Sequence, residues 1–493
     1  MSTMWSTKME LFNPSRTPPL PPGPRGLPIV GYLPFLGNNL LHKFGDLADR
    51  YGPIYKFYLG NQLCVVINSP SLVKEVARDQ DSIFANRDSN IATLAATYDG
   101  NDIAFSPLNS QWRALRKIFV REVLSNNSLQ ASYDLRKDEV RKAIRDVHNN
   151  IGKPIHFGEL SFRTELNVIM NMMWGGVVDD EEEGQRVGEE FREVVIKLVD
   201  LMGKPNVADY LPVLAWFDIQ GVKKEVEGYV QSMDRIFESV IAKCRKMSGG
   251  IKKERKKDFL QFMLELQEKE DSEMSISMRQ IKAVLVDFVL AGTDNTSTTI
   301  EWAMAELLNN PKAMANVQNE LSKVVGLNNE VEEFHIPKLK YMEAIIKETM
   351  RLHPAIPLLI PRSPTQTSTV GGYTVPKKSM VFINLPWIQR DPSLWDSPLE
   401  FKPERFLHDK TCQFNGNNFN YLPFGSGRRI CAGMPLAERM LMYLLASLLH
   451  SFQWKLPDGE TVDMSYTFGT VLRKSTPLLA IAMPRLSKPN LYG

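Results

Sequence analysis

Apolar residues recur with a helical period through most of the 493-residue chain. Where they return every three or four residues, the pattern predicts helices over Pro70–Arg78, Ser110–Leu124, Ile276–Leu308, Tyr341–Leu352 and Pro435–Phe452. Two stretches alternate instead and predict short hairpins, Tyr51–Asn68, which turns near Gly60, and Gly371–Asn384. The chain is therefore expected to be mainly α with small β-sheets.

A proline-rich stretch, residues 18–28, precedes the periodic part. Such a stretch is stiff and extended, because proline fixes φ and cannot donate a backbone hydrogen bond. From about residue 40 onward we find neither a second linker nor an internal repeat. We therefore expect an N-terminal segment over residues 1–17, a hinge over 18–28 and a single domain over 29–493.

Composition and hydropathy narrow the class of protein. With 43% apolar and 24% charged residues the chain is not disordered, and a net charge of +2 argues against nucleic-acid binding. No apolar run reaches the ~18 residues of a spanning helix, and residues 1–17 do not form a signal peptide. The chain as given is expected to lack a membrane anchor and to make at most peripheral membrane contact.

Four cysteines are too few and too scattered for a disulfide framework, and they lack the paired spacing of a zinc site: Cys64, Cys244, Cys412 and Cys431. Cys431 differs because it follows a glycine-rich run and precedes an apolar helix, whose amides and dipole should lower the pKa of its thiol. Phe424 could cover the sulfur. A single thiolate suffices as the axial ligand of a haem iron. The alternative is a structural cysteine in a tight turn.

These residues resemble a known signature. The pattern FxxGxRxCxG, formed by Phe424, Gly427, Arg429, Cys431 and Gly433, is similar to the haem-binding motif of the cytochrome P-450 (haem-thiolate monooxygenase) superfamily. Three more of its motifs follow the family order: Ala291–Asp294 in the oxygen-binding helix, ExxR at Glu348–Arg351 and PERF at Pro403–Phe406. The resemblance implies the cytochrome P-450 fold, with haem (heme b, iron protoporphyrin IX) between the oxygen-binding helix and the cysteine-loop helix, and Cys431 as the metal ligand.

The more detailed likeness is to plant microsomal members. The stretches PPLPPGPRGLPIVG, LPFGSGRRICAG and PRLSKPNLY resemble plant sesquiterpene hydroxylases of the δ-cadinene 8-hydroxylase kind. Those proteins carry a membrane helix before the hinge, so the resemblance implies the cytosolic face of the endoplasmic reticulum membrane.

Charged residues in and near these motifs are expected to have structural or haem-binding roles. Glu348 and Arg351 are three apart on one helix face and can pair, with Arg405 joining from a later loop as a buried structural clamp. By resemblance, Trp112 and Arg116 bind the haem propionates, as do two further arginines, Arg362 and Arg429.

The opposite face of the Trp112 helix carries a basic stripe of Arg113, Lys117 and Arg121. Two interpretations stay open. The stripe is either a solvated helix face or a docking surface for an acidic electron-transfer partner, since complementary charge raises the encounter rate.

The oxygen-binding helix departs from its family at one position. Asp294, Asn295 and Thr296 are the candidate catalytic residues, but Asn295 stands where relatives usually have the threonine that helps deliver protons. An amide donates hydrogen bonds but cannot relay a proton as a hydroxyl does. Gly292 is expected to leave room for dioxygen.

Substrate-facing positions follow from the resemblance and are almost wholly apolar or aromatic: Tyr98, Phe105, Phe288, Ala291, Ile356, Leu359, Phe468 and Val471. Such a lining fits a small lipophilic substrate.

We therefore expect a monooxygenase that uses O2 and electrons from NADPH, delivered by NADPH-cytochrome P-450 reductase, to hydroxylate a terpenoid-like molecule. Two alternatives remain: a haem-thiolate isomerase or dehydratase that needs no reductase, and a non-enzymatic haem-binding protein.

Overall fold

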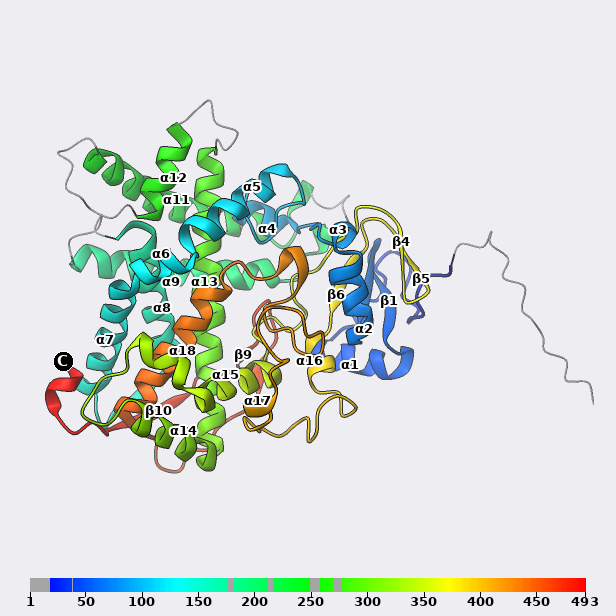
Figure 1. Cartoon of the computed structure of the whole chain (residues 1–493). Helices are drawn as coiled ribbons and strands as arrows, with labels where there is room; N and C mark the ends of the chain where they lie inside the picture. Colours follow the sequence, from blue (N-terminus) through cyan, green and yellow to red (C-terminus); the bar gives the residue numbers. More distant parts are fainter. Residues whose placement is uncertain (1–17, 38, 176–180, 212–215, 249–257, 269–275) are drawn as a thin grey trace, which may run out of the picture.

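The computed structural model describes residues 18–37, 39–175, 181–211, 216–248, 258–268 and 276–493 (Figure 1). The helices are α1 (Leu40–Tyr51), α2 (Pro70–Lys74), α3 (Asp81–Phe84), α4 (Ile91–Ala96), α5 (Ser110–Ile118), α6 (Asn126–Ala131), α7 (Tyr133–Asn149), α8 (Phe157–Trp174), α9 (Glu181–Gly203), α10 (Val207–Tyr210), α11 (Val222–Ser248), α12 (Phe259–Glu268), α13 (Met278–Asn309), α14 (Pro311–Val324), α15 (Lys340–Leu352), α16 (Leu385–Gln389), α17 (Arg405–His408) and α18 (Met434–Ser451). The strands are β1 (Ile54–Leu59), β2 (Gln62–Ile67), β3 (Pro154–His156), β4 (Ser368–Val370), β5 (Tyr373–Val375), β6 (Met380–Ile383), β7 (Phe452–Lys455), β8 (Tyr466–Thr467), β9 (Arg473–Lys474) and β10 (Leu479–Pro484).

Helix α13 runs through the middle of the helical part, with α8 and α18 beside it (Figure 1). It begins at a capping box in which Ser277 and Gln280 satisfy each other's backbone N–H groups. Most of its side chains are buried, since helices cover it on several sides. The predicted mainly α fold with small sheets is confirmed, and the predicted long helices are present with ends shifted by at most two residues.

Two predicted helices change geometry before they end. The helix that starts at Pro70 becomes a π-helix over Glu75–Asp79, and α5 continues as a π-helix over Phe119–Val123. A π-turn widens the helix by one residue per turn and re-aims the side chains that follow.

The first hairpin prediction is confirmed, because β1 pairs antiparallel with β2. The second is wrong. Strand β5 pairs antiparallel with β4, while β6 pairs in parallel with β2 in another sheet. The turn lies at Gly371 and Gly372, which both have positive φ (57° and 79°) as a tight hairpin turn requires.

The proline-rich segment lies against the sheets. Pro22 accepts a hydrogen bond from the Lys56 N–H (2.8 Å), and Pro19 accepts one from the Thr374 N–H (2.8 Å). A Cβ at Gly23 would lie 1.8 Å from the Lys56 carbonyl oxygen, so glycine permits this approach. Within the described part of the chain, no helix has the length and apolarity needed to cross a membrane.

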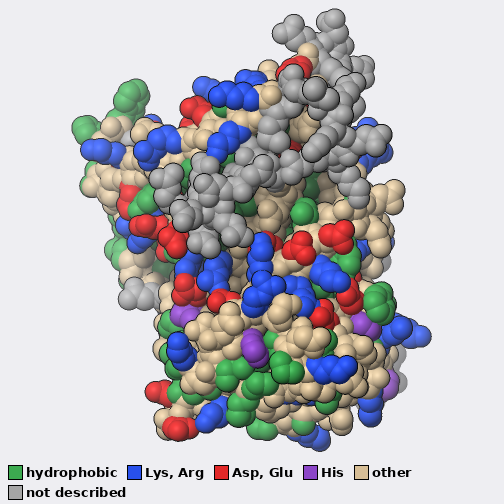
Figure 2. All heavy atoms as spheres, turned by 90° about the vertical axis from the view of Figure 1, so that its left-hand side faces the viewer, with side chains coloured by type: hydrophobic (Ala, Val, Ile, Leu, Met, Phe, Trp, Pro, Cys, Tyr) green, Lys and Arg blue, Asp and Glu red, His purple; other side chains and the backbone are tan. Residues whose placement is uncertain are grey.

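On the face that includes α7, basic and acidic side chains are interspersed (Figure 2). Ion pairs join α7 to the segment around residue 333: Arg136 donates to Glu333 (2.7 Å) and Lys137 to Glu332 (2.6 Å). The fully buried Arg136 is therefore compensated, as a buried charge must be.

Candidate functional site

The cysteine loop is shaped by glycines. The Cys431 N–H donates to the Phe424 carbonyl (2.9 Å), which closes the loop. Gly425 and Gly427 have φ of 73° and 69°, a region that L side chains rarely adopt. A Cβ at Gly427 would also lie 2.2 Å from the Ala77 carbonyl oxygen. Both glycines are thus required by the backbone.

Cys431 is exposed, whereas the other three cysteines are buried. Its sulfur is hydrogen-bonded by the backbone at Gly433 and Met434, where α18 begins, and it lies near the Arg116 charge. These groups lower the pKa of the thiol as predicted, but desolvation by the protein around the exposed thiol outweighs them, and the net shift is upward. The sequence prediction of a lowered pKa is therefore wrong for the protein alone. A bound metal ion removes the proton from a coordinating thiol outright.

Helix α13, which packs against α18, has an accessible stripe in a mostly buried segment. Asp287, Ala291 and Asn295 are spaced by four, so they lie on one face, and Ala291 is exposed although Leu290 and Thr293 are buried. An exposed alanine at the centre of a core helix borders a space rather than packed protein. Ala291 on α13 and Cys431 just before α18 thus both have exposed side chains on the elements expected to enclose the haem.

Two buried arginines, Arg362 and Arg429, and the half-buried Arg116 lie beside the cysteine loop. Arg362 donates to Asp81 (3.2 Å) and to the Ser426 carbonyl (2.6 Å). Arg429 donates to three backbone carbonyls, including Ala85 (2.6 Å), and its pKa is lowered to about 10 by burial. Arg116 donates to the Ile430 carbonyl (2.5 Å). The three arginines that the resemblance assigned to haem carboxylates are therefore brought together around one loop.

Two further observations bear on this cluster. Trp112 gives its indole N–H to the Ile103 carbonyl (2.9 Å), and its ring lies 4.2 Å from the Arg429 guanidinium. Arg87, which the sequence did not indicate, is also buried, and its Nε has no hydrogen-bond partner among the described residues. Burial lowers the pKa of Arg87, and the charges of Arg362 and Arg429 lower it further.

Arginine keeps its charge at neutral pH, so this buried cluster holds more cations than nearby carboxylates such as Asp81. An anionic group is needed to balance it. The residues present fit a haem: carboxylates for the arginines, and an iron for the exposed thiol of Cys431.

The clamp residues meet behind the loop. Glu348 and Arg351 are fully buried and form two hydrogen bonds of 2.7 and 2.9 Å. Arg405 adds a third at 3.0 Å to Glu348, and Arg351 also donates to the carbonyls of Gln389 and Pro398 (2.7 Å each). The network ties α15 to the segment that leads into the cysteine loop.

The predicted catalytic acid, Asp294, forms an ion pair with an arginine. Arg473, from β9, donates to both carboxylate oxygens of the buried Asp294 (3.0 and 2.7 Å) and also to Asp200 of α9 (2.5 Å). Burial raises the pKa of Asp294, although Arg473 opposes the shift. Thr296 is buried next to it. The sequence did not indicate Arg473.

Asn295 donates through Nδ2 to the Ala291 carbonyl (3.0 Å), and its buried Oδ1 has no partner among the described residues. Gly292 makes room for α8 rather than for dioxygen, because a Cβ there would lie 2.3 Å from Ile169 Cδ1.

A second carboxyl group lies on the accessible stripe. Asp287 accepts the N–H groups of Ile103 (2.6 Å) and Ala104 (3.2 Å) and is hydrogen-bonded to Asp102. Burial, followed by the charge of Asp102, raises the pKa of Asp287 well above its usual range. The two carboxyls therefore share a proton that Asp287 carries. The sequence signal was the single acid in an apolar run.

The predicted substrate-facing residues do not form one cluster. Tyr98, Phe105, Phe288 and Val471 belong to the main core or pack against it, Leu359 packs against a second apolar cluster and Phe468 against a third; Ala291 and Ile356 are in none. The Tyr98 hydroxyl donates to Asp234 of α11 (2.8 Å). Leu359 lies near the cysteine loop, since a Cβ at Gly425 would be 3.8 Å from it.

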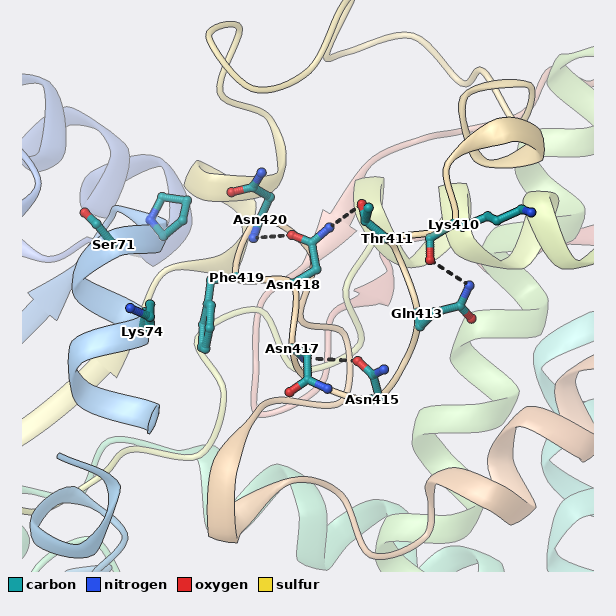
Figure 3. Close-up of a pocket in the computed structure, with 11 residues that line it drawn as sticks. Ser71, Lys74, Lys410, Thr411, Gln413, Asn415, Asn417, Asn418, Phe419 and Asn420 are labelled. Carbon is teal, nitrogen blue, oxygen red and sulfur yellow. Dashed lines mark hydrogen bonds between the residues drawn. The ribbon is translucent and has the colours of Figure 1, made fainter. Parts of the chain in front are cut away.

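A surface hollow of about 610 Å³ lies between the start of α2 and residues 410–420 (Figure 3). Its walls are mostly polar, and Asn418 donates across one of them to Thr411 (3.2 Å). It contains none of the predicted site residues and does not suit a lipophilic molecule.

With this geometry established, comparison with known proteins decides the family. The family model described as Cytochrome P450 matches residues 21–481. The chain belongs to the cytochrome P450 family. The cofactor of this P450 is haem, which supplies oxygen activation and electron acceptance when bound. Cys431 would hold the iron, and Arg116, Arg362 and Arg429, with Arg87, would hold the carboxylates.

This P450 is similar to several plant proteins. It is 38% identical over 468 residues to cytochrome P450 monooxygenase 76AD131 of Lophophora williamsii (94% of this chain, 92% of that protein). It is 39% identical over 472 residues to geraniol 8-hydroxylase of Swertia mussotii (94% of each). It is 35% identical over 487 residues to a flavonoid 3'-monooxygenase of Crocosmia x crocosmiiflora (96% and 94%). The plant-type resemblance is confirmed.

Solved structures share the fold. A zebrafish cytochrome P450 with progesterone has a TM-score of 0.76 at 26% identity, and one with abiraterone has 0.77 at 24%. Each comparison covers 91% of this chain and 100% of the other.

Proposed function

We propose that this P450 is an NADPH-dependent hydroxylase of a small lipophilic molecule, of the terpenoid class. The observation that supports it is the exposed Cys431 thiol at the start of α18, with arginines beside its loop. Helix α18 packs against α13, which carries the accessible Ala291. The reaction takes one oxygen atom into a C–H bond. The other oxygen atom leaves as water, with two electrons from NADPH and two protons. The terpenoid class is chosen because this chain is similar to geraniol 8-hydroxylase, whose name gives a terpenoid substrate.

The electron donor would be NADPH-cytochrome P-450 reductase, docking on the basic stripe of α5 and of the π-helix that continues it. Arg113, Lys117 and Arg121 are exposed, and no described residue forms an ion pair with them. Arg116, on the inner face of the same helix, contacts the cysteine loop at Ile430. Only the width of α5 therefore separates the stripe from the loop. Unpaired surface cations steer an acidic partner, and salt weakens that steering.

Membrane contact at the cytosolic face of the endoplasmic reticulum would use an exposed apolar surface. Trp216 and Phe217 are 93% and 74% exposed, and Ile29 is 74% exposed. Backbone bonds bring Val30 and Tyr210 to the same turn between β1 and β2, because Gly60 donates to Val30 (3.1 Å) and Asn61 to Tyr210 (3.4 Å). Exposed aromatic residues of this kind sit well at a lipid interface.

The activity test incubates the purified holoprotein with reductase, NADPH and a panel of terpenes under 18O2. A product that gains one labelled oxygen, formed only with reductase and NADPH, supports the proposal. Conversion without reductase would identify an isomerase or dehydratase instead. A spectral shift on adding ligand, without any product, would indicate a haem-binding protein.

The docking and membrane proposals have separate readouts. Lys117→Glu should slow reduction of the haem by reductase and remove part of its salt dependence, whereas Lys153→Glu, on another surface segment, should not. Trp216→Ser with Phe217→Ser should reduce flotation of the protein with vesicles. Unchanged reduction or flotation would contradict the corresponding proposal.

A further inference from the structure

Helix α8 packs along α13 (Figure 1), and contacts between the two helices show that they run in opposite directions. A Cβ at Gly292 of α13 would lie 2.3 Å from Ile169 of α8, and a Cβ at Gly158 of α8 would lie 2.9 Å from Glu301 of α13. Moving back along α8 therefore corresponds to moving forward along α13. Residue 165 of α8 is one turn before Ile169. It therefore lies opposite the turn of α13 that follows Gly292, which contains Asn295 and Thr296.

That residue is Glu165. On a helix of about 3.6 residues per turn, positions 158, 165 and 169 fall within ~40° of one another, so Glu165 is on the face that contacts α13. The residue is 2% exposed, its Oε1 has no hydrogen-bond partner among the described residues, and none of them forms an ion pair with it. A buried carboxylate without a partner is very costly. Glu165 is therefore a neutral carboxylic acid, and burial raises its pKa well above the ordinary value.

Two more buried polar atoms without partners lie in the same region. Ser161 is one turn before Glu165 on α8, and its Oγ has no partner among the described residues. The Oδ1 of Asn295 is also buried and has no hydrogen-bond partner among the described residues. Asn295 lies between the accessible stripe of α13 and the face toward α8, since it is four residues from Ala291 and three from Gly292. It is thus placed to connect the two sides of the helix.

We propose that Glu165 is a proton-holding positioning residue for oxygen chemistry: with Ser161 and Asn295 it binds water behind α13 and supplies that water with a proton. A buried water typically makes about three hydrogen bonds to otherwise unsatisfied polar groups, which is what these atoms offer. The inference rests on the proposed monooxygenase function and names a route for its protons.

The proton balance shows what such a group changes. Hydroxylation consumes one O2, two electrons from NADPH and two protons, and gives product and one water. If protons arrive too slowly or at the wrong place, the same two electrons and two protons leave as hydrogen peroxide and no product forms. Glu165 gives one proton to the water, becomes a carboxylate, and takes a proton back through the same water. The amide of Asn295 holds that water but does not exchange protons itself.

Two acids of the neighbouring helix α13, Asp294 and Asp287, are less suited to this role than Glu165 of α8. Asp294 is held by two hydrogen bonds from Arg473. Asp287 is neutral, but its oxygens are used by two backbone N–H groups and by Asp102. Compared with these two, Glu165 combines a neutral carboxyl, an Oε1 without a partner among the described residues and a position behind Asn295.

The test is Glu165→Gln, which keeps size and polarity but cannot release a proton, with Glu159→Gln on the outer side of α8 as the matched control. Infrared difference spectra of the holoprotein in H2O and D2O should show a protonated carboxyl band that Glu165→Gln alone removes. Product per NADPH should fall by about tenfold, with peroxide rising to match, because acid–base groups contribute ~10²–10⁴-fold and other water can replace part of this. The carbon-monoxide Soret band should be unchanged.

A double-mutant cycle separates proton supply from mere packing. Asn295→Thr places a hydroxyl that can relay protons from elsewhere, so Glu165→Gln should cost much less in that background. Ser161→Ala, which barely changes volume, should lower coupling in the same direction by a smaller factor. It also keeps the proposal testable if Glu165→Gln does not fold.

Three results would overturn the inference. These are survival of the carboxyl band in Glu165→Gln, unchanged coupling in both Glu165→Gln and Ser161→Ala, and equal losses with and without Asn295→Thr. Failure of the proposed function looks different, because NADPH would then not be consumed with any terpene in the unmodified protein.

Discussion

Arg473 holds the carboxylate of Asp294 through two hydrogen bonds of 3.0 and 2.7 Å. This pair links β9 to the middle of α13, and Asp294 is almost fully buried. Removing one partner of a buried ion pair strands the other and typically costs about 3–5 kcal/mol. Because Arg473 is itself partly exposed, we expect Arg473→Ala to cost less than this, while Arg473→Lys keeps most of the stability. Urea unfolding of the holoproteins measures the difference, and equal midpoints for both variants would contradict it.

Cys431→Ala should abolish the red-shifted carbon-monoxide Soret band of thiolate-ligated haem. The physical reason is that Cys431 is the exposed one of the four cysteines, and its sulfur receives backbone hydrogen bonds at Gly433 and Met434. Cys412→Ala is the control, because Cys412 is buried and burial raises its pKa to about 12. Loss of the band in the control, with retention in Cys431→Ala, would disprove the assignment.

Arg405→Ala should yield little folded, haem-loaded protein. Glu348 is fully buried and depends on Arg351 and Arg405 for its hydrogen bonds, so truncating Arg405 leaves part of its charge uncompensated. Arg405→Lys should recover an intermediate amount. The haem-to-protein absorbance ratio after purification is the measurement, and normal loading with altered turnover alone would argue against a structural clamp.

Asp287 should make stability depend on pH. The folded protein binds the Asp287 proton more tightly than the unfolded chain does, because burial and Asp102 raise its pKa above 3.8. Its contribution is therefore complete at low pH and declines as the pH rises above that ordinary value. Asp287→Asn cannot ionise and should flatten this decline.

Asp287→Ala should instead lose stability at every pH, since Ile103 and Ala104 lose the acceptor of their N–H groups. Denaturant midpoints at about pH 5 and about pH 8 distinguish the three proteins. A steeper decline in Asp287→Asn than in the unmodified protein would show that Asp287 is already ionised.

Asn295→Thr should increase product formed per NADPH. A threonine hydroxyl both accepts and donates a proton at one atom, whereas the amide of Asn295 does not, and general acid catalysis is typically worth about 10²–10⁴-fold. The ratio of product to NADPH, measured at saturating reductase, tests this. Tight coupling in the unmodified protein that Asn295→Thr impairs would show that the amide is adapted to this site.

The sequence by itself determined the long helices, the β1–β2 hairpin and the cysteine loop. These depend on local features: apolar periodicity, the positions of turn-forming residues, and a short run of glycines around one cysteine. Motif spacing also indicated Glu348, Arg351 and Arg405 as partners, because two of them share a helix face and PERF supplies the third.

Only the tertiary structure decided which charged groups meet. Strand β6 pairs with β2 rather than β5, and Gly292 accommodates Ile169, because these choices depend on packing between segments distant in sequence. Arg473 reaches Asp294 from 179 residues away, and Arg87 joins the arginine cluster in the same manner. The direction of the Cys431 pKa shift is also opposite to the prediction, since a sequence shows the nearby amides and the helix end but not the desolvation by surrounding protein that opposes them.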